Sequence, residues 1–320
     1  MLASLAACGS DNARTIDAAR PIDAIPDAPP DALLDAPAPP ANAHRFVVDH
    51  EHLPTNNNEA RMYGLDLNGD ATVDNQLGMV IATFSGMGLS TQPGLDHAID
   101  TGAIEILADV EAADLTTAAQ ATVALFDGTN AMPAPCHGSG DTTCRHHLAG
   151  TATFDVASTS AHDTPLAGAI VAGVLDAGPG TLHLRTMILG APVDLQLIGA
   201  RVRLTQPSDT GIMTGIIAGA ITQTEIDASL IPALQAAVTA QIAVDCSALT
   251  TPPGCGCADG STGKTFIALF DANQNCAVTT DEIKNNSLIM SLLSPDVTID
   301  AMPALSLGVG VSAVHAAFTP

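Results

Sequence analysis

The sequence predicts a mainly β protein whose antiparallel strands form a sandwich or a barrel-like sheet, and three observations support this fold class. Between residues 181 and 219, apolar and polar residues alternate with the period of two that is typical of half-buried strands. Turn residues interrupt the alternation at 190–192 and at Gly199, so the neighbouring strands are expected to be antiparallel with one solvated face. A last alternating run, from Leu305 to Val311, predicts a closing strand.

Four earlier segments also alternate and are expected to be strands. They cover residues 45–53, 102–110, 121–126 and 150–156. In the stretch 181–219 the solvated face gathers Arg185, Arg201 and Arg203 beside Asp194, and cross-strand pairing with carboxylates is the simplest explanation for these arginines. The β-rich body is therefore expected to span residues 45–245, and residues 296–320 return to it as the closing strand.

One helix, residues 223–244, is expected to pack against the sheet. Thr222 and Glu225 have the spacing of a capping box, and apolar residues then recur every four positions to make a single stripe. Pro232 is expected to kink this helix because it lacks an amide donor. Residues 246–295 follow as a helix-loop-helix insertion that carries four of the seven cysteines.

This insertion contains the most informative segment of the chain, DANQNCAVTTDE at residues 271–282. Oxygen-bearing groups fall at positions 1, 3, 5, 7, 9 and 12, an order that suits one hard cation with a bidentate carboxylate at the last position. They belong to Asp271, Asn273, Asn275, Ala277 (through its carbonyl), Thr279 and Glu282. Apolar residues at helical spacing flank the loop as far as Pro295, so the segment resembles an EF-hand and indicates Ca²⁺. The alternative is a surface turn rich in Asn and Asp that holds no metal.

A second acidic loop, DLNGDATVD at residues 66–74, is a possible further metal site. Its candidate ligands are Asp66, Asn68, Asp70, Thr72 and Asp74. The first three alternate as calcium ligands do, but position 12 is Leu77, so no bidentate carboxylate follows at the usual distance. The loop is either a calcium clip completed by ligands from elsewhere in the chain or a turn that depends on its Asn, Gly and Asp residues alone.

Six of the seven cysteines are expected to form disulfides, because an even number is typical of an oxidising compartment. Cys136 and Cys144 bracket a short loop and are natural partners. Three pairings remain open among Cys246, Cys255, Cys257 and Cys276. One of these bonds is expected to hold Cys276 at position 6 of the calcium-like loop, where glycine is usual because φ is positive.

Two further patterns suggest other chemistry. His137, His146 and His147 lie beside Cys136 and Cys144, so a Cys2His2 zinc site is the alternative to a disulfide there; the pair His146-His147 is otherwise expected in a solvated loop. The segment ADGSTGKT at 258–265 satisfies the loose form of a phosphate-binding loop. Such a loop follows a buried strand and opens a long helix, whereas this one follows the cysteine-rich CGC, so we reject it.

The N-terminal residues predict an exported, lipid-anchored protein. Leu5-Ala6-Ala7-Cys8 resembles a bacterial lipobox, in which Cys8 carries the lipid. Residues 1–8 are interpreted as the remnant of a lipoprotein signal with the true start codon upstream, because a signal peptide needs a basic region and a longer apolar run. Residues 9–44, rich in Asp, Ala and Pro, are expected to be a disordered tether between the anchor and the body.

The composition restricts the partners. The formal net charge is −24, with 10 Lys and Arg against 34 Asp and Glu, so nucleic acid is not expected as a partner because its phosphates could not be neutralised. Such a negative surface attracts divalent cations and repels anionic lipid head groups, so we expect membrane contact through the N-terminal lipid only. Nothing in the sequence specifies a protein partner.

Four segments, LAAC, the Asp-Ala-Pro tether, DLNGDATVDNQLG and DANQNCAVTTDEIKNNSLI, resemble EF-hand-containing secreted lipoproteins of myxobacteria-like species. The resemblance implies calcium binding and a place in the bacterial cell envelope, at the outer membrane or cell surface, but no activity. We therefore expect a non-enzymatic calcium-binding protein with a structural or partner-binding role. The alternative is a secreted hydrolase with a structural calcium ion, which predicts a cleft that gathers a histidine, a carboxylate and a nucleophile such as a serine.

Overall fold

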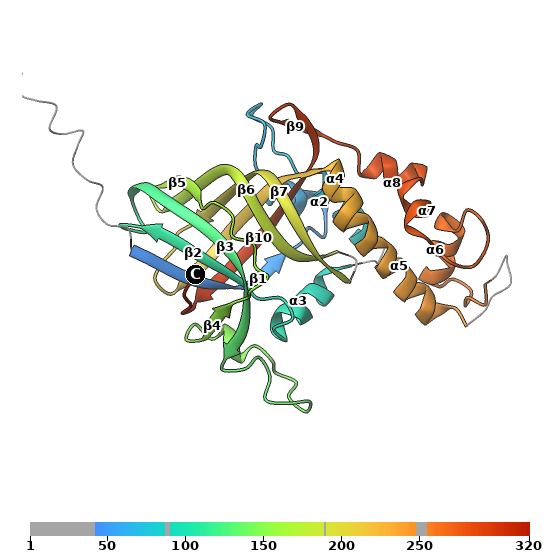
Figure 1. Ribbon diagram of the computed structural model, residues 1–320, viewed down its shortest axis with the longest axis horizontal. Coiled ribbons are helices and arrows are strands. Elements are labelled where there is room, and N and C mark those ends of the chain that lie inside the picture. Colours follow the sequence, from blue (N-terminus) through green and yellow to red (C-terminus); the bar gives the residue numbers. More distant parts are fainter. Residues whose placement is uncertain (1–41, 87–89, 189, 248–254) are drawn as a thin grey trace, which may run out of the picture. The chain divides into compact units, whose positions relative to one another are not determined.

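Eight antiparallel strands close into a barrel (Figure 1). The computed structural model describes residues 42–320 except 87–89, 189 and 248–254. Each strand pairs with the next in the order β1-β2-β3-β5-β6-β7-β8-β10, and β10 pairs back with β1. These strands are β1 (Asn42–His52), β2 (Ile106–Ala112), β3 (Ala118–Met132), β5 (Leu166–Val171), β6 (Val174–Ile188), β7 (Ala191–Thr205), β8 (Gly211–Thr222) and β10 (Met302–His315). The predicted mainly β fold is confirmed, and of its two forms the protein adopts the barrel.

Side chains fill the barrel interior, as is usual when only eight strands form the wall. Along β6, Leu182 and Leu184 are almost completely buried, whereas His183 between them is partly exposed. On the outer surface, Arg203 of β7 lies opposite Asp176 of β6, and its Nε donates to Oδ1 of that residue at 2.6 Å. The predicted alternation is therefore present, and it leaves arginine and carboxylate side chains paired on the solvated face.

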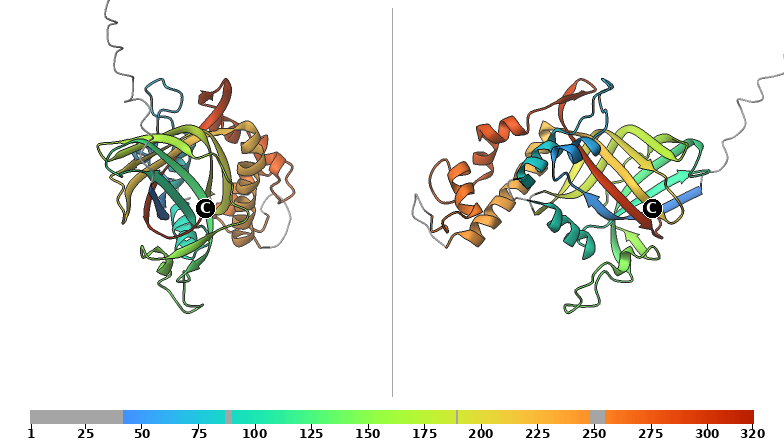
Figure 2. Two further views of the ribbon diagram at one scale, coloured as in Figure 1. Left: turned by 60° about the vertical axis from the view of Figure 1, so that its left-hand side comes forward. Right: turned by 180° about the vertical axis from the view of Figure 1, so that it is seen from behind.

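Three short helices that the sequence analysis did not predict lie between β1 and β2: α1 (Asn57–Met62), α2 (Gln76–Gly86) and α3 (Gln92–Asp100). α2 packs against β10, which is red in the right view of Figure 2. Gly308 of β10 permits a close approach, since a Cβ there would lie 2.2 Å from the carbonyl oxygen of Tyr63. Asn75 exchanges two hydrogen bonds with the backbone of Gly308, at 2.8 and 2.9 Å. These helices are short and held by tertiary contacts, so no long apolar stripe marks them in the sequence.

The helix predicted after β8 runs from Gln223 to Asp245 in three consecutive segments: α4 (Gln223–Glu225), the π-helical turn η2 (Ile226–Leu230) and α5 (Ile231–Asp245). The proline at position 232 lies in the first turn of α5, directly after the π-helical turn, where a missing amide donor is tolerated. By length and mean hydropathy (1.2) alone this stretch could cross a membrane. In the fold it contacts β7, and Leu230 and Val238 are buried in the core.

The insertion forms three further helices on the side of α5 away from the barrel: α6 (Thr262–Phe270), α7 (Thr280–Lys284) and α8 (Ser287–Leu292) (Figure 1). The apolar run after the calcium-like loop predicts one helix, but the structure divides it between Lys284 and Ser287. Asn286 explains the break. Its side chain accepts hydrogen bonds from two amides at the start of α8, and its Nδ2 donates to the carbonyl oxygen of Leu269 in α6 at 2.9 Å, so a new helix start is favoured over continuation.

The structure moves the predicted boundary between the tether and the body. The lipobox residue Cys8 and residues 1–41 lie outside the described residues, and the last part of the predicted tether, residues 42–44, belongs to β1. The described residues belong to one compact unit. Within it, the closing segment 296–320 adds β9 (Val297–Ile299) beside β10, and β4 (Thr153–Val156) pairs with β3.

Candidate metal centres

The calcium-like segment 271–282 links the end of α6 to the start of α7, and apolar residues anchor it on both sides. Phe270, Val278 and Ile283 are buried, and Gln235 of α5 donates to the carbonyl oxygen of Val278 at 2.9 Å. Most of the loop between these anchors is exposed. Its polar side chains are therefore accessible from the medium, while its backbone is attached to α5, α6 and α7.

The two carboxylates at the ends of this loop both bind its backbone. Asp271 accepts hydrogen bonds from the amides of Asn275 at 2.9 Å and Cys276 at 2.8 Å. Glu282 reaches back to the first half of the loop and accepts a hydrogen bond from the amide of Asn273 at 3.2 Å. The carboxylates at positions 1 and 12 of the predicted ligand set thus both bind the backbone of one short loop. Glu282 itself lies in the first turn of α7.

The other predicted ligands lie on the same loop. Thr279 forms a capping box with Glu282, in which the amide and the hydroxyl of Thr279 both donate to the carboxylate at 2.9 Å. The side-chain oxygen of Asn275 accepts a hydrogen bond from the amide of Ala277 at 2.9 Å. Burial opposes ionisation of Glu282, but the hydrogen bonds from Thr279, Asn273 and Ala272 outweigh it, so the pKa of this carboxyl is lowered. Glu282 is therefore negatively charged at neutral pH.

Cys276, at position 6 of the loop, adopts a φ of 65°, the left-handed conformation for which glycine is usual. As predicted, it is bonded in a disulfide, and its partner is Cys255. A carboxylate oxygen of Asp271 and the two sulfur atoms lie within 4.8 Å of one another. Sulfur in a disulfide is not a thiolate, so this pair does not offer metal ligands. The disulfide instead holds the strained turn beside the first carboxylate.

The loop at 66–74 shares two side-chain to backbone hydrogen bonds and one positive φ with the first half of 271–282. The position-1 carboxylate accepts from the position-6 amide in both loops, from Ala71 to Asp66 at 2.9 Å and from Cys276 to Asp271 at 2.8 Å. Position 6 has a positive φ in both, 67° at Ala71. The position-5 side chain accepts from the position-7 amide in both, at 2.7 Å in the first loop and 2.9 Å in the second. The two loops therefore share a local backbone conformation, with Asn68 and Thr72 exposed in the first.

The two loops differ in how they are closed. The first loop is closed by Asp74 at position 9, which accepts a hydrogen bond from the amide of Leu67 at 2.8 Å. Leu77, at position 12, is buried in α2 and offers no oxygen. The first loop is thus closed by the shorter side chain of Asp74 at position 9, whereas the second is closed by Glu282 at position 12.

Carboxylates collect around Asp74. It is buried, and burial raises its pKa; the hydrogen bond from Leu67 has a smaller, opposite effect, and the charges of Asp70, Asp296 and Asp66 raise the pKa further. Asp296 comes from the segment before β9, where it also accepts hydrogen bonds from the amide and hydroxyl of Ser306. The fold therefore brings an acidic residue from the far end of the chain near this loop, which the sequence could not indicate.

The described cysteines form three disulfides, Cys136–Cys144, Cys246–Cys257 and Cys255–Cys276. The structure thus selects one of the three pairings that the sequence left open. Because Cys136 and Cys144 are bonded to each other, the Cys2His2 zinc alternative is wrong. His147 is also not in a solvated loop: it is completely buried, its Nε2 lies 3.1 Å from the carbonyl oxygen of Ile99, and burial lowers its pKa.

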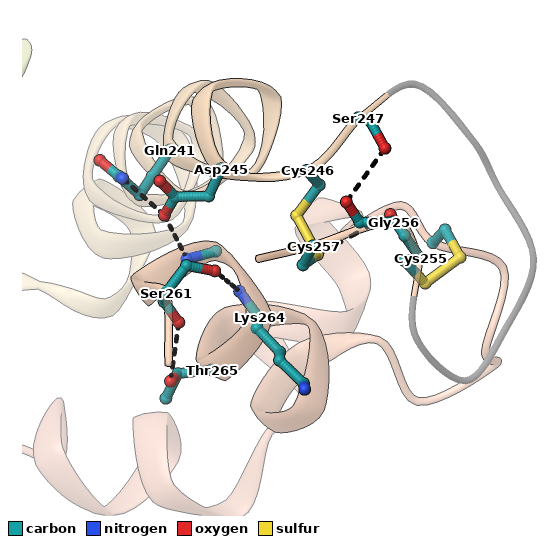
Figure 3. Close-up of a disulfide and its surroundings, with 12 residues drawn as sticks. Gln241, Asp245, Cys246, Ser247, Cys255, Gly256, Cys257, Ser261, Lys264 and Thr265 are labelled. Atoms are coloured by element: carbon teal, nitrogen blue, oxygen red, sulfur yellow. Dashed lines mark hydrogen bonds between the residues drawn. A yellow bond between two sulfur atoms is a disulfide. The ribbon is translucent and has the colours of Figure 1, made fainter. Parts of the chain in front are cut away.

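Figure 3 shows why the GKT segment is not a phosphate-binding loop. Asp245, the last residue of α5, accepts a hydrogen bond from the amide of Gly263 at 2.7 Å, so a carboxylate already occupies the start of α6, where a phosphate would bind. Lys264 donates to Asp259 at 2.5 Å. The Cys246–Cys257 disulfide holds the end of α5 beside this turn. The segment therefore joins two helices.

A cavity of about 750 Å³ beside β4 contains the residue types that the hydrolase alternative requires, Asp155, Ser158 and His162. In the described part of the chain no hydrogen bond connects these three side chains. Asp155 instead accepts a hydrogen bond from Asn130 at 3.0 Å. A nucleophile within hydrogen-bond reach of a base is the first requirement of this chemistry, so the cavity gives the hydrolase alternative no support.

Comparisons of the chain with protein-family models, with curated proteins and with solved structures found no match.

Proposed function

We propose that this chain is a calcium-binding protein of the bacterial cell envelope, held at the outer membrane or cell surface by a lipid on Cys8, with a structural or partner-binding role. The observation that carries the proposal is the arrangement of Asp271 and Glu282, whose carboxylates are bound by backbone amides of one exposed loop. With the amide, hydroxyl and carbonyl oxygens of Asn273, Asn275, Thr279 and Ala277, they make an all-oxygen donor set, which is the set that Ca²⁺ prefers.

The ion would strengthen a helical unit that already has contacts of its own. Glu282 caps α7, and Lys284 at the end of α7 binds Asp227 of η2 at 2.6 Å. Calcium sites of extracellular modules have dissociation constants of about 10⁻⁴–10⁻³ M. At a calcium concentration ten times the dissociation constant, binding to the folded state alone contributes about 1.4 kcal/mol to stability. We therefore propose a structural ion and not a signal.

We propose the loop at 66–74 as a second, weaker calcium site. It shares with the loop at 271–282 the hydrogen bonds from the position-6 amide to the position-1 carboxylate and from the position-7 amide to the position-5 side chain. Burial raises the pKa of Asp74, and repulsion from the charges of Asp70, Asp296 and Asp66 raises it further. A divalent cation would relieve this repulsion. It lacks a carboxylate at position 12, so its affinity is expected to be lower than that of the loop closed by Glu282.

Calorimetric titration of the chain with Ca²⁺ tests the proposal. Glu282→Gln keeps the size of the side chain and removes one bidentate carboxylate, so the tighter site should be lost or weakened at least about tenfold. Asp281→Asn is the matched control, because it removes the same charge from the neighbouring exposed position of α7. Asp74→Asn should affect the weaker site alone. Equal binding heats for the wild type and Glu282→Gln, or no calcium binding by the wild type, contradict the proposal.

A further inference from the structure

A second kind of donor cluster lies in the loop between β3 and β4. His137, Asp141 and His146 each direct one possible ligand atom toward the others, and these three atoms lie within 4.8 Å of one another. The Cys136–Cys144 disulfide closes the loop that carries His137 and Asp141, and His146 follows two residues after this loop. The sequence analysis considered the two histidines together with the cysteines and did not include Asp141. In the structure the two cysteine sulfurs are bonded to each other and are not available as ligands. The donor atom beside the two imidazoles is a carboxylate oxygen of Asp141.

Asp141 is oriented before any ligand arrives. Its Oδ1 accepts hydrogen bonds from the amide and the hydroxyl of Thr143, both at 2.9 Å. Its Oδ2 accepts from the amide of His137 at 2.9 Å and lies 2.9 Å from Nε2 of His146. The backbone supports the same arrangement, because the amide of His146 donates to the carbonyl oxygen of Pro135 at 3.2 Å. One carboxylate oxygen is thus presented to the histidines while the other is held by Thr143.

The two imidazole rings lie close together beside this carboxylate. The ring centroids of His137 and His146 are 4.0 Å apart, and the ring planes are inclined by 39°. Arg145, the nearest arginine in the sequence, directs its guanidinium to Asp100 and to the carbonyl oxygen of Asp49 and not to the Asp141 carboxylate. Two imidazole nitrogens and one carboxylate oxygen are thus available to a single cation.

We propose that His137, Asp141 and His146 form a binding site for a zinc-class divalent cation. Imidazole nitrogens are borderline donors that suit Zn²⁺ and related late first-row metals, and Zn²⁺ also accepts a carboxylate oxygen, whereas Ca²⁺ takes oxygen ligands. Zn²⁺ binds such donors at about 2.0–2.2 Å, so three ligands of one ion lie at most about 4 Å apart. The exposed side chain of His137 needs to move by less than about 1 Å to meet this limit. With three protein ligands, the remaining coordination position is left to water.

The hydrogen bonds of Asp141 to Thr143 and to the amide of His137 act as outer contacts that fix the carboxylate, as is usual for metal ligands. A bound ion would replace the contact between Asp141 and His146 with two metal bonds. It would also join the tip of the disulfide-closed loop to the start of the 3-10 helix η1 (His146–Leu148). The site is separate in sequence and in donor chemistry from the proposed calcium loops.

Equilibrium dialysis of the chain against Zn²⁺, with a calcium excess in the buffer, tests this site. One zinc ion per chain is expected. His137→Gln and His146→Gln should each weaken binding at least about tenfold, because each removes a ligand of an ion held by only three protein groups. His97→Gln, on the exposed surface of α3, is the matched control and should bind zinc as the wild type does. Co²⁺ should bind at the same place and give the visible absorption of a four-coordinate ion.

His137→Gln keeps this test independent of folding. The His137 side chain is exposed, so the thermal unfolding midpoint of the metal-free variant should match that of the wild type. The calcium titration of the same variant should also be unchanged, which separates this inference from the proposed calcium function. The inference is overturned if the wild type binds no zinc, or if His137→Gln and His146→Gln both retain the wild-type affinity.

Discussion

Replacing Glu51 with glutamine should remove much of the pH dependence of this protein's stability. Glu51 lies on β1 opposite Val311 of β10, and it is completely buried. Among the described residues neither of its carboxyl oxygens has a hydrogen-bond partner of normal geometry. Burial raises its pKa to about 8, and the nearby hydroxyl of Thr186 has a smaller, opposite effect. At neutral pH Glu51 is therefore mainly protonated, a neutral state that glutamine imitates.

The magnitude follows from the proton balance between the folded and unfolded chains. The pKa of Glu51 is 4.5 in the absence of these effects and about 8 in the fold. Between these values the folded state holds a proton that the unfolded state has released, so the free energy of unfolding falls as the pH rises and levels off above the folded pKa. One pKa unit corresponds to about 1.4 kcal/mol. From about pH 5 to about pH 9, Glu51 should lower the stability by about 4 kcal/mol.

Urea unfolding, followed by circular dichroism with the disulfides intact, measures this effect across the pH range. The wild type and Glu51→Gln should have similar stability near the acidic end, and the variant should become more stable by up to about 4 kcal/mol at the alkaline end. Glu111→Gln, at an exposed position of β2, is the control and should follow the wild type. In Glu51→Gln the free energy of unfolding should still fall with pH, but less steeply, because burial also raises the pKa of Glu105 to about 7. Parallel curves for the wild type and Glu51→Gln refute the reasoning, since they mean that Glu51 titrates alike in both states.

Two further substitutions test how the segments outside the barrel are held. Asn75→Ala removes the buried side chain that bonds both backbone groups of Gly308, so it should cost about 2–4 kcal/mol in urea unfolding; a loss below about 1 kcal/mol contradicts that role. The double substitution Cys255→Ala with Cys276→Ala removes a disulfide between residues 21 positions apart and should lower the free energy of unfolding by about 3 kcal/mol. The same pair should weaken the proposed calcium site, because position 6 loses its support; an unchanged calcium affinity by calorimetry would show that the disulfide does not shape the loop.

The proposed calcium site at 271–282 and the proposed zinc-class site differ in the donors that each loop presents. The loop at 271–282 offers oxygen atoms alone, and its disulfide lies beside the first ligand without contributing one. The loop around Asp141 offers two imidazole nitrogens with a single carboxylate. Ca²⁺, a hard cation, should prefer the all-oxygen loop, and Zn²⁺, a borderline cation, should prefer the loop with the imidazoles. The binding of each ion can therefore be measured in an excess of the other. A disulfide restrains each loop: Cys136–Cys144 closes the loop that carries Asp141, and Cys255–Cys276 ties the turn at position 6 of the other to a preceding segment. Such bonds suit small surface segments that lack a core of their own.

The local patterns of the sequence indicated much of this structure. Alternation with a period of two located the long strands β6, β7 and β10, because side chains of a strand point alternately to the two faces of a sheet. The spacing of oxygen-bearing residues marked the loop at 271–282 as a candidate metal site, since its proposed ligands are neighbours in the chain. Cys276 in the glycine position predicted a disulfide there, and the structure contains it. Each of these features depends on residues that are close in sequence.

The remaining features depend on contacts between distant residues, and only the tertiary structure decided them. The pairing of β1 with β10 makes the sheet a closed barrel, and no local pattern distinguishes that pairing from a sandwich. The helices between β1 and β2 are stabilised by contacts such as Asn75 with Gly308 and not by a long apolar stripe. Asp296 approaches the first acidic loop, and Glu51 becomes buried, only when the strands close. Local geometry follows from neighbouring residues, whereas burial and long-range pairing depend on the whole fold. Burial sets the charge of Glu51, and long-range contacts set the surroundings of Asp74.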